Sequence, residues 1–285
     1  MTVLVFGRTG QVCKELARAP PGAVLLGRDV ADLTDPETCA AAIRDHAPAA
    51  VMNAAAYTAV DDAETDAAQA MRINADAPGA MARECAALGV PMVHISTDYV
   101  FDGGTGAPWR PSDAPAPVNA YGRSKLAGER AVQHSGALHA ILRTSWVFSA
   151  HGTNFVRTML RLSRDRPALG IVDDQRGGPT PAADIARACL CIAEALRTDP
   201  GKGGLYHYSG APDVSWKAFA EVIFDMAGRD TAITGIETAD WPTPARRPCD
   251  SRLDCSTTET AFGLPRPAWR AGLRDVLEQL GEVCR

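Results

Sequence analysis

The chain has 285 residues, of which 46% are hydrophobic and 22% are charged, and its formal net charge is −5. These values are typical of a globular protein with a large buried core, and the acidic balance excludes a general affinity for nucleic acid. No apolar run is long enough to span a membrane and no secretory leader precedes the first apolar run, so a cytoplasmic protein is expected.

The first predicted strand, at residues 2–6, is followed by the turn GRTGQVC and by a helix expected over 11–19. Gly7 would make the tight turn, and Gly10 would let the backbone approach a pyrophosphate at the start of the helix. Cys13 stands where the usual dinucleotide-binding fingerprint has its last glycine, which serves helix–strand packing. A simple strand–helix turn could have the same residues, so the motif alone does not decide.

The second predicted strand, at residues 23–26, ends in the sequence LLGRD, and a helix is expected over 36–46. An acidic residue at this strand end binds the ribose hydroxyls of NAD, whereas an arginine suits the 2′-phosphate of NADP. Arg28 comes before Asp29, which favours NADPH over NADH. The alternative is that both side chains are simply solvated.

Further apolar runs at 49–55, 91–96 and 139–148 alternate with helical stretches that extend through residue 87 and over 121–134. Such alternation predicts an α/β fold with a Rossmann-type doubly wound parallel sheet. The pattern loosens after residue 150, with helices at 154–162 and up to 196 and a strand at 205–210. We therefore expect an NAD(P)-binding domain over 1–150 and a smaller C-terminal substrate-binding lobe over 151–285, with strands near 171–210 returning to the first sheet.

Candidate catalytic residues lie in STDYVF and YGRSK. Thr97 ends a strand and would face a cleft at the carboxyl edge of the sheet, and Tyr121 and Lys125 would share one helix face. A tyrosine with a pKa near ~10 is a poor acid–base group, and a nearby lysine cation would lower that pKa. Such a tyrosine can protonate a carbonyl oxygen as hydride arrives at its carbon. A surface tyrosine–lysine pair is the ordinary alternative.

Eight segments resemble, in order, the landmarks of the dTDP-4-dehydrorhamnose reductases, which are extended short-chain dehydrogenase/reductases. These segments are GRTGQV, NAAAYTAVDDAE, ISTDYVFDG, NAYGRSKLAGE, RTSWVF, VDDQRGGPT, GLYHYSG and TPARRPCDSRLD. The resemblance implies NADPH- or NADH-dependent reduction of the C4 ketone of dTDP-4-dehydro-L-rhamnose to dTDP-L-rhamnose. It also implies that GRTGQVC is an intact cofactor turn in which Cys13 is a packing substitution.

The resemblance assigns a role to each candidate residue. Tyr121 would be the general acid, Lys125 would hold the nicotinamide ribose, and Thr97 would hydrogen-bond near the reacting carbonyl. The implied cofactor-binding residues are Gly7, Gly10, Gln11, Val12, Arg28, Asp32, Leu33, Ala55, Ala56 and Tyr57. The implied substrate-binding residues are Thr58 (next to the cofactor), Asp98, Tyr99 and Trp146, the last offering an apolar face to the sugar. Arg246 and Arg247 would meet substrate phosphates or pair with nearby carboxylates.

A required metal is not expected. Some family members bind magnesium between subunits through glutamates, and Glu15 matches one such position, but Ala183 stands where a second glutamate would be. A lone carboxylate is a poor site for a hard cation. A homodimer is compatible with the resemblance. The 8 cysteines are expected as reduced thiols, His94 as a core histidine, and the acidic residues 61–66 as the charged start of a helix.

Three alternative functions remain open at this point. A sister reductase would act on another dTDP-4-keto-6-deoxyhexose. A non-catalytic NADP-binding regulatory subunit, like that of methionine adenosyltransferase, would share the fold, but Thr97 and Trp146 favour the catalytic branch. An epimerase would also have the tyrosine and lysine, but RTSWVF and VDDQRGGPT argue against it.

Overall fold

The computed structural model describes residues 2–18, 23–104 and 106–283. Its centre is a six-stranded parallel sheet with the order β10-β5-β4-β3-β1-β2. The strands are β1 (Val3–Phe6), β2 (Ala23–Leu26), β3 (Ala50–Asn53), β4 (Met92–Thr97), β5 (His139–Thr144) and β10 (Gly204–His207). The strand order reverses between β1 and β3, and ligands of doubly wound sheets bind at the carboxyl edge beside such a reversal.

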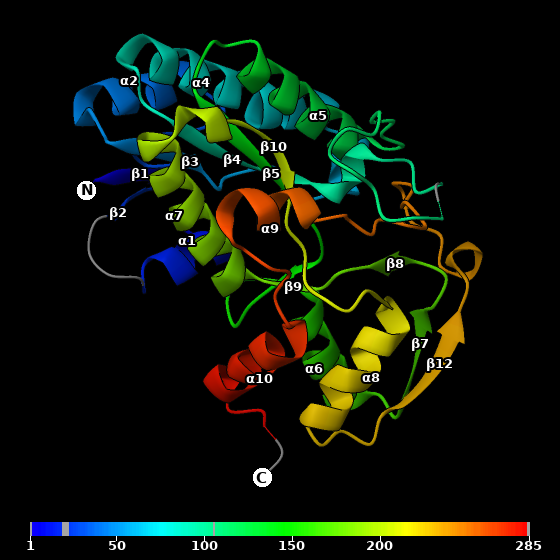
Figure 1. Ribbon diagram of the computed structural model, residues 1–285. Helices are drawn as coiled ribbons and strands as arrows, with labels where there is room; N and C mark the ends of the chain where they lie inside the picture. The colour runs from blue at the N-terminus through cyan, green and yellow to red at the C-terminus, as the bar shows by residue number, and fades with distance from the viewer. Residues whose placement is uncertain (1, 19–22, 105, 284–285) are drawn as a thin grey trace.

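Helices cover both faces of this sheet, as predicted from the continuous apolar strands (Figure 1). One face carries α2 (Pro36–His46), α4 (Ala77–Leu88) and α5 (Ala120–Gln133), and the other carries α1 (Gln11–Leu16) and α7 (Ala182–Thr198). Side chains of β1 alternate between the two cores: Leu4 and Phe6 pack toward α2 and α4, and Val3 and Val5 toward α1 and α7.

A smaller lobe with its own core follows the first five sheet strands. It contains α6 (Phe155–Asp165), α8 (Trp216–Met226), α10 (Trp269–Leu280) and the parallel pair β7 (Ala168–Val172) and β12 (Ala232–Ile236), with Phe219 and Trp269 buried between them. Short strands and helices complete the chain: β6 (Val147–Phe148), β8 (Arg176–Gly177), β9 (Thr180–Pro181), β11 (Val214–Ser215), α3 (Ala67–Met71) and α9 (Ser256–Phe262). The predicted domain boundary near residue 150 stays a prediction, although β10 does join the main sheet beside β5.

Two predicted elements differ from the structure. The strand expected over 139–148 is divided into β5 and β6, because Trp146 has φ +46°, which an extended strand cannot contain. The helical stretch before residue 88 contains a π-helical turn at Arg72–Asp76 between α3 and α4. Apolar content indicates where a strand or a helix lies, but it does not report such local changes of backbone path.

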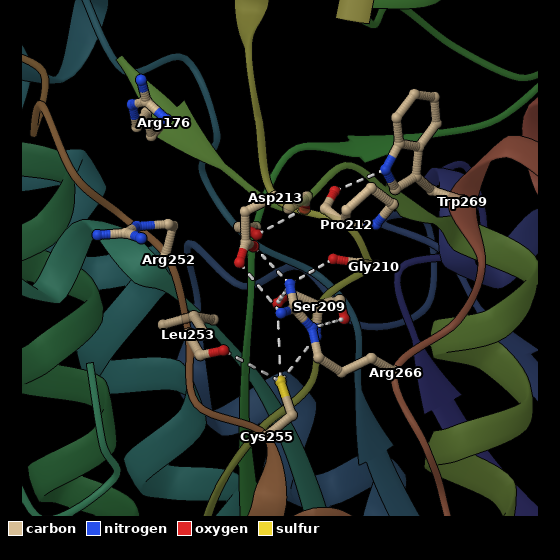
Figure 2. Close-up of polar contacts among 12 residues, drawn as sticks. Arg176, Ser209, Gly210, Pro212, Asp213, Arg252, Leu253, Cys255, Arg266 and Trp269 are labelled. Carbon is tan, nitrogen blue, oxygen red and sulfur yellow. Dashed lines mark hydrogen bonds and ion pairs between the residues drawn. The ribbon is translucent and has the colours of Figure 1, made fainter. Parts of the chain in front are cut away.

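A polar cluster joins the end of the chain to the segment after β10 (Figure 2). The Arg266 guanidinium donates to the carbonyl oxygen of Ser209 at 3.1 Å and pairs with the Asp213 carboxylate at 3.1 Å. The Trp269 indole N–H donates to the carbonyl oxygen of Pro212 at 2.8 Å, and the Ser209 amide donates to the Cys255 sulfur at 3.3 Å. These contacts fix the small lobe against the carboxyl end of the sheet, where the cleft lies.

Candidate active site

A cleft of about 780 Å³ follows the carboxyl ends of β1, β3, β4 and β5. The residues that the sequence predicted for catalysis, cofactor binding or substrate binding line it, apart from Arg246 and Arg247. Segments from residue 7 to residue 146 therefore meet in one space, and Trp216 of the small lobe adds to its wall. The role of each residue in binding or catalysis stays a prediction.

The glycine turn after β1 has a backbone that requires glycine. Gly7 has φ +111°, and a Cβ there would lie 3.0 Å from the backbone nitrogen of Ala55. Gly10 is the N-cap of α1 and provides no side-chain cap, and its amide donates to the Gly7 carbonyl at 2.8 Å. The start of α1 therefore has no side-chain cap, as binding of a pyrophosphate requires.

Cys13 fills the contact between α1 and β1. Its side chain is fully buried, and its thiol donates to the carbonyl oxygen of Phe6 at 3.5 Å. Burial raises the pKa of the Cys13 thiol to about 12. The residue thus has the environment of a packed structural thiol rather than of a reactive one.

Two arginines line the cleft near the end of β2, Arg28 after that strand and Arg8 after Gly7. The Arg28 Nε atom lies 3.8 Å from the Asp32 carboxylate, and Arg8 pairs with Asp29 at 2.8 Å. The Arg8 guanidinium lies over Gly27, where a Cβ would be 2.8 Å from it. Sequence reasoning considered Arg28 but missed Arg8, whose only sequence signal is a basic residue directly after Gly7.

Two caps fix the start of α5. The Asn119 side chain accepts from the Gly122 amide at 2.7 Å, and the Glu64 carboxylate accepts from the Ala120 amide at 2.7 Å. A Cβ at Gly122 would lie 2.2 Å from the Tyr99 carbonyl oxygen, so only glycine permits this close approach. Glu64 comes from the acidic stretch 61–66, which thus serves the N-terminus of α5 rather than that of the helix directly after it.

Tyr121 lies at this start of α5, and its ring meets Tyr99 edge-on at 5.7 Å between centroids. Burial raises the pKa of Tyr121 to about 12, and a hydrogen bond with Thr97 opposes the rise to a smaller extent. This direction is opposite to the one expected from a nearby lysine. The phenol therefore stays protonated at neutral pH, which is the state that a proton donor needs.

Lys125 lies one turn further along the same face and is 2% exposed. Its ammonium donates to the Ile95 carbonyl oxygen at 2.7 Å. Burial lowers the pKa of Lys125 to about 8, while the nearby Glu129 carboxylate raises it. A cation is thus held at the floor of the cleft beside Tyr121.

Polar groups beside Tyr121 face the cleft from β4 and β5. Thr97 donates to the Asp98 carboxylate at 3.0 Å, and burial raises the pKa of Asp98 to about 6. Thr144, which pairs with Thr97 in the sheet register, was missed by the sequence analysis. Its buried hydroxyl has no hydrogen-bond partner among the described residues, and neither does the second Asp98 oxygen. Both are free to meet a ligand.

Two stacked indoles form the wall toward the small lobe. Trp146 and Trp216 have ring centroids 3.5 Å apart and planes 7° apart. The Trp216 indole N–H donates to the Gln175 side chain at 3.2 Å, which fixes the orientation of the stack. The prediction placed Trp146 at the sugar but missed Trp216, because its position depends on how α8 packs against the cleft.

Arg247 and Arg246 differ in their surroundings. Arg247 pairs with Asp61 through two contacts of 2.7 Å, and its guanidinium lies close enough to Tyr99 to affect the pKa of both. Arg246 is exposed, and its carbonyl oxygen accepts from the Asn119 side chain at 2.8 Å. Of the two roles considered for these arginines, pairing with a carboxylate is the one seen for Arg247.

The candidate metal residue Glu15 lies beside two basic side chains of the chain itself. Its carboxylate lies 3.3 Å from the His151 ring nitrogen and 3.6 Å from the Arg18 guanidinium. Within residues 2–18, 23–104 and 106–283, no three His, Cys, Asp or Glu side chains gather as a metal site would require. His94 is fully buried against Asn53, and burial lowers its pKa, as for a core histidine.

Comparisons with known proteins agree with this geometry. The family model "RmlD substrate binding domain" matches residues 1–282. The dTDP-4-dehydrorhamnose reductase of Burkholderia thailandensis is 45% identical over 98% of this chain and 100% of its own, and that of Sinorhizobium fredii is 43% identical over 96% of each chain.

Solved structures of the same enzyme are also similar. That of Clostridium acetobutylicum has a TM-score of 0.92 at 33% identity and covers 99% of this chain and 100% of its own. That of Bacillus anthracis, solved in complex with NADP, has a TM-score of 0.90 at 31% identity and covers 98% of this chain and 100% of its own.

Proposed function

Because the chain belongs to the dTDP-4-dehydrorhamnose reductase family, a family of oxidoreductases, we propose that it reduces the C4 ketone of dTDP-4-dehydro-L-rhamnose to dTDP-L-rhamnose. The observation that carries the proposal is the convergence in one cleft of the Gly7 turn with Thr97, Tyr121 and Lys125. A glycine turn alone supports nucleotide binding, and a tyrosine–lysine pair alone supports very little. Their shared cleft provides both a cofactor site and a proton donor.

The cleft suits a nicotinamide dinucleotide. The Gly7 backbone leaves no room for a Cβ, the start of α1 has no side-chain cap, and a similar structure has NADP bound. When bound, NADPH or NADH would supply the hydride that reduces the ketone carbon. Gly10, Gln11 and Val12 would meet the pyrophosphate.

The residues of the chain would supply the proton and the orientation. Tyr121, protonated at neutral pH, donates its proton to the ketone oxygen, and the Thr97 hydroxyl turns from Asp98 to hydrogen-bond near the same oxygen when substrate binds. The Lys125 ammonium stabilises the phenolate that Tyr121 becomes and holds the nicotinamide ribose. Asp98, Tyr99 and Trp146, which line the same cleft, hold the sugar.

We further propose NADPH as the preferred cofactor. Arg8 and Arg28 both line the cleft beside the end of β2, and Asp29, which could otherwise bind ribose hydroxyls, is paired with Arg8. Two guanidinium groups here favour a 2′-phosphate.

The test is an assay of purified protein with NADPH or NADH and a panel of enzymatically made dTDP-4-keto-6-deoxyhexoses, with the products identified. We expect consumption of dTDP-4-dehydro-L-rhamnose and formation of dTDP-L-rhamnose. Efficient reduction of a different sugar in the panel, with little of this one, would assign the chain to a sister reductase. Retention of the dinucleotide with no turnover on any sugar would contradict the proposal.

Two further proposals concern where the protein is located and whether it forms a dimer. Among the described residues, no helix is long and apolar enough to cross a membrane. A cytoplasmic location and a homodimer are proposed on the family resemblance.

A further inference from the structure

The inner face of α5 carries a third residue in the row that begins with Tyr121 and Lys125. Glu129 follows Lys125 by four positions, so the three side chains lie on one helix face. Lys125 contacts the carbonyl oxygen of Ile95, and Glu129 accepts from the hydroxyl of Ser96 at 2.5 Å. Consecutive residues of β4 are thus held by consecutive turns of the helix.

Glu129 also joins α5 to β5 through a buried ion pair. The Arg143 guanidinium donates to the two carboxylate oxygens at 2.8 Å and 2.6 Å, and the side chains are only 1% and 2% exposed. Arg143 lies directly opposite Ser96 in the sheet register, and its third nitrogen lies 3.4 Å from the His207 ring of β10. The guanidinium carbon of Arg143 also lies over the Phe101 ring, 4.9 Å from the ring centroid.

Glu129 is the carboxylate that faces two buried cations, Lys125 and Arg143. The other titratable groups of this cluster come from neighbouring elements: His94 (β4) interacts with Lys125, Asp98 (after β4) with Tyr121, and His207 (β10) with Arg143 (β5). Burial favours the neutral forms of the two histidines, lowering the pKa of His207 to about 3. Asp98 lies at the start of α5, beside Tyr121, whereas Glu129 lies beyond Lys125.

Stability alone does not account for such a pair. The desolvation cost of a buried ion pair often exceeds its Coulombic gain, and the best attested use of buried charges is to specify one register. We propose that Glu129 is a positioning residue of the reduction, which fixes α5 against β4 and β5 and thereby places Tyr121 and Lys125 beside Thr97. The proposal rests on the proposed function, because it deepens the role of that same site.

Two variants separate positioning from folding. Glu129→Gln keeps the shape and one acceptor but removes the charge, and the double variant Glu129→Met/Arg143→Met replaces the pair with apolar side chains of similar length. The matched control is Glu84→Met/Arg44→Met, which removes a 2.9 Å ion pair between α4 and α2. Far-UV circular dichroism and the melting temperature report whether each variant folds.

The expected result is a loss of kcat of at least ~10-fold in both Glu129 variants, because small displacements of reacting groups are costly. The alkaline limb of the kcat–pH profile should move to lower pH, since the Lys125 cation loses its neighbouring carboxylate. The affinity for NADPH, measured by fluorescence titration without turnover at a series of pH values, should fall at correspondingly lower pH. The control should match the wild type in both profiles.

Unshifted profiles of kcat and NADPH affinity in a folded Glu129 variant would overturn the inference, and so would failure of both variants to fold, which would make the pair a stability element. Failure of the proposed function looks different. In that case the wild type reduces no dTDP-4-keto sugar, and the NADPH titrations still decide the role of Glu129.

Discussion

Tyr121 combines a half-buried ring with a hydrogen bond to Thr97, and this combination defines its expected behaviour. Tyr121→Phe removes the proton donor and leaves the glycine turn and the ring packing against Tyr99 in place. We expect turnover to fall by at least ~100-fold, the usual size of a general-acid contribution, while NADPH affinity changes little. Steady-state kinetics and a fluorescence titration check this, and near-normal turnover would show that another group donates the proton.

Arg8 and Arg28 allow the cofactor preference to be divided between two side chains. Arg8 is fixed by its pair with Asp29, whereas Arg28 is 76% exposed and lies 3.8 Å from Asp32. We expect Arg8→Ala and Arg28→Ala each to raise the KM for NADPH by about 10-fold and the KM for NADH by much less, because only NADPH has the 2′-phosphate.

The kinetic constants for both cofactors provide the measurement, and Arg18→Ala, outside the cleft, is the control. Equal losses for NADPH and NADH would mean that the arginines only shape the adenosine site. A wild type that prefers NADH would show that Asp29 or the backbone sets the choice.

The position of helix α1 against β1 depends on the packing of Cys13, so substitutions at Cys13 should move or destabilise this helix. Cys13→Gly should preserve NADPH binding, because Gly7 and Gly10 form the turn, but should destabilise the helix by up to ~1 kcal/mol. Cys13→Leu should force α1 away from β1, with an overpacking cost of about 1–3 kcal/mol, and weaken binding of the pyrophosphate. Denaturant unfolding and NADPH titration measure the two effects.

Thiol labelling separates the packing role from a reactive one. Burial of Cys13 and its raised pKa predict slow labelling in the native protein, with or without NADPH. Rapid labelling that NADPH prevents would identify an accessible thiol at the cofactor site instead.

At the scale of the whole molecule, the sheet could be predicted because its strands are continuous apolar runs separated by helical stretches. The expected strand at 23–26 and helix at 36–46 match β2 and α2 residue for residue. Trp146 breaks a predicted strand because its left-handed backbone is set by contacts with residues distant in the chain, including Gly177 and Trp216. No local pattern contains that information.

In the candidate site, too, some features follow from local sequence and others from tertiary packing. The glycine turn and the Tyr121–Lys125 spacing are local, so the sequence contains them. Arg8, Thr144 and Trp216 line the cleft because of tertiary packing, and their residue types are ordinary at their positions. Glu129 follows Lys125 in sequence, but its role depends on Arg143 from another strand.

The Trp146–Trp216 stack joins the two parts of the molecule, since Trp146 follows β5 of the main sheet and Trp216 begins α8 of the small lobe. Trp216→Ala should free the Trp146 ring and loosen the wall of the cleft on the substrate side. We expect the KM for the sugar to rise by about 2- to 10-fold, with little change in NADPH affinity, because aromatic pairs contribute about 0.5–1.5 kcal/mol beyond the area they bury.

Trp216→Phe keeps an aromatic ring against Trp146 and is therefore the matched control, with an expected KM near that of the wild type. Near-ultraviolet circular dichroism reports the stack directly, since two indoles in parallel contact give a coupled signal that Trp216→Ala should abolish. If that signal disappears while the KM for the sugar is unchanged, the stack holds the two parts of the molecule together without contacting the substrate. If NADPH affinity falls instead, the Trp146–Trp216 stack contacts the cofactor, and the sugar must bind on the side of Tyr99.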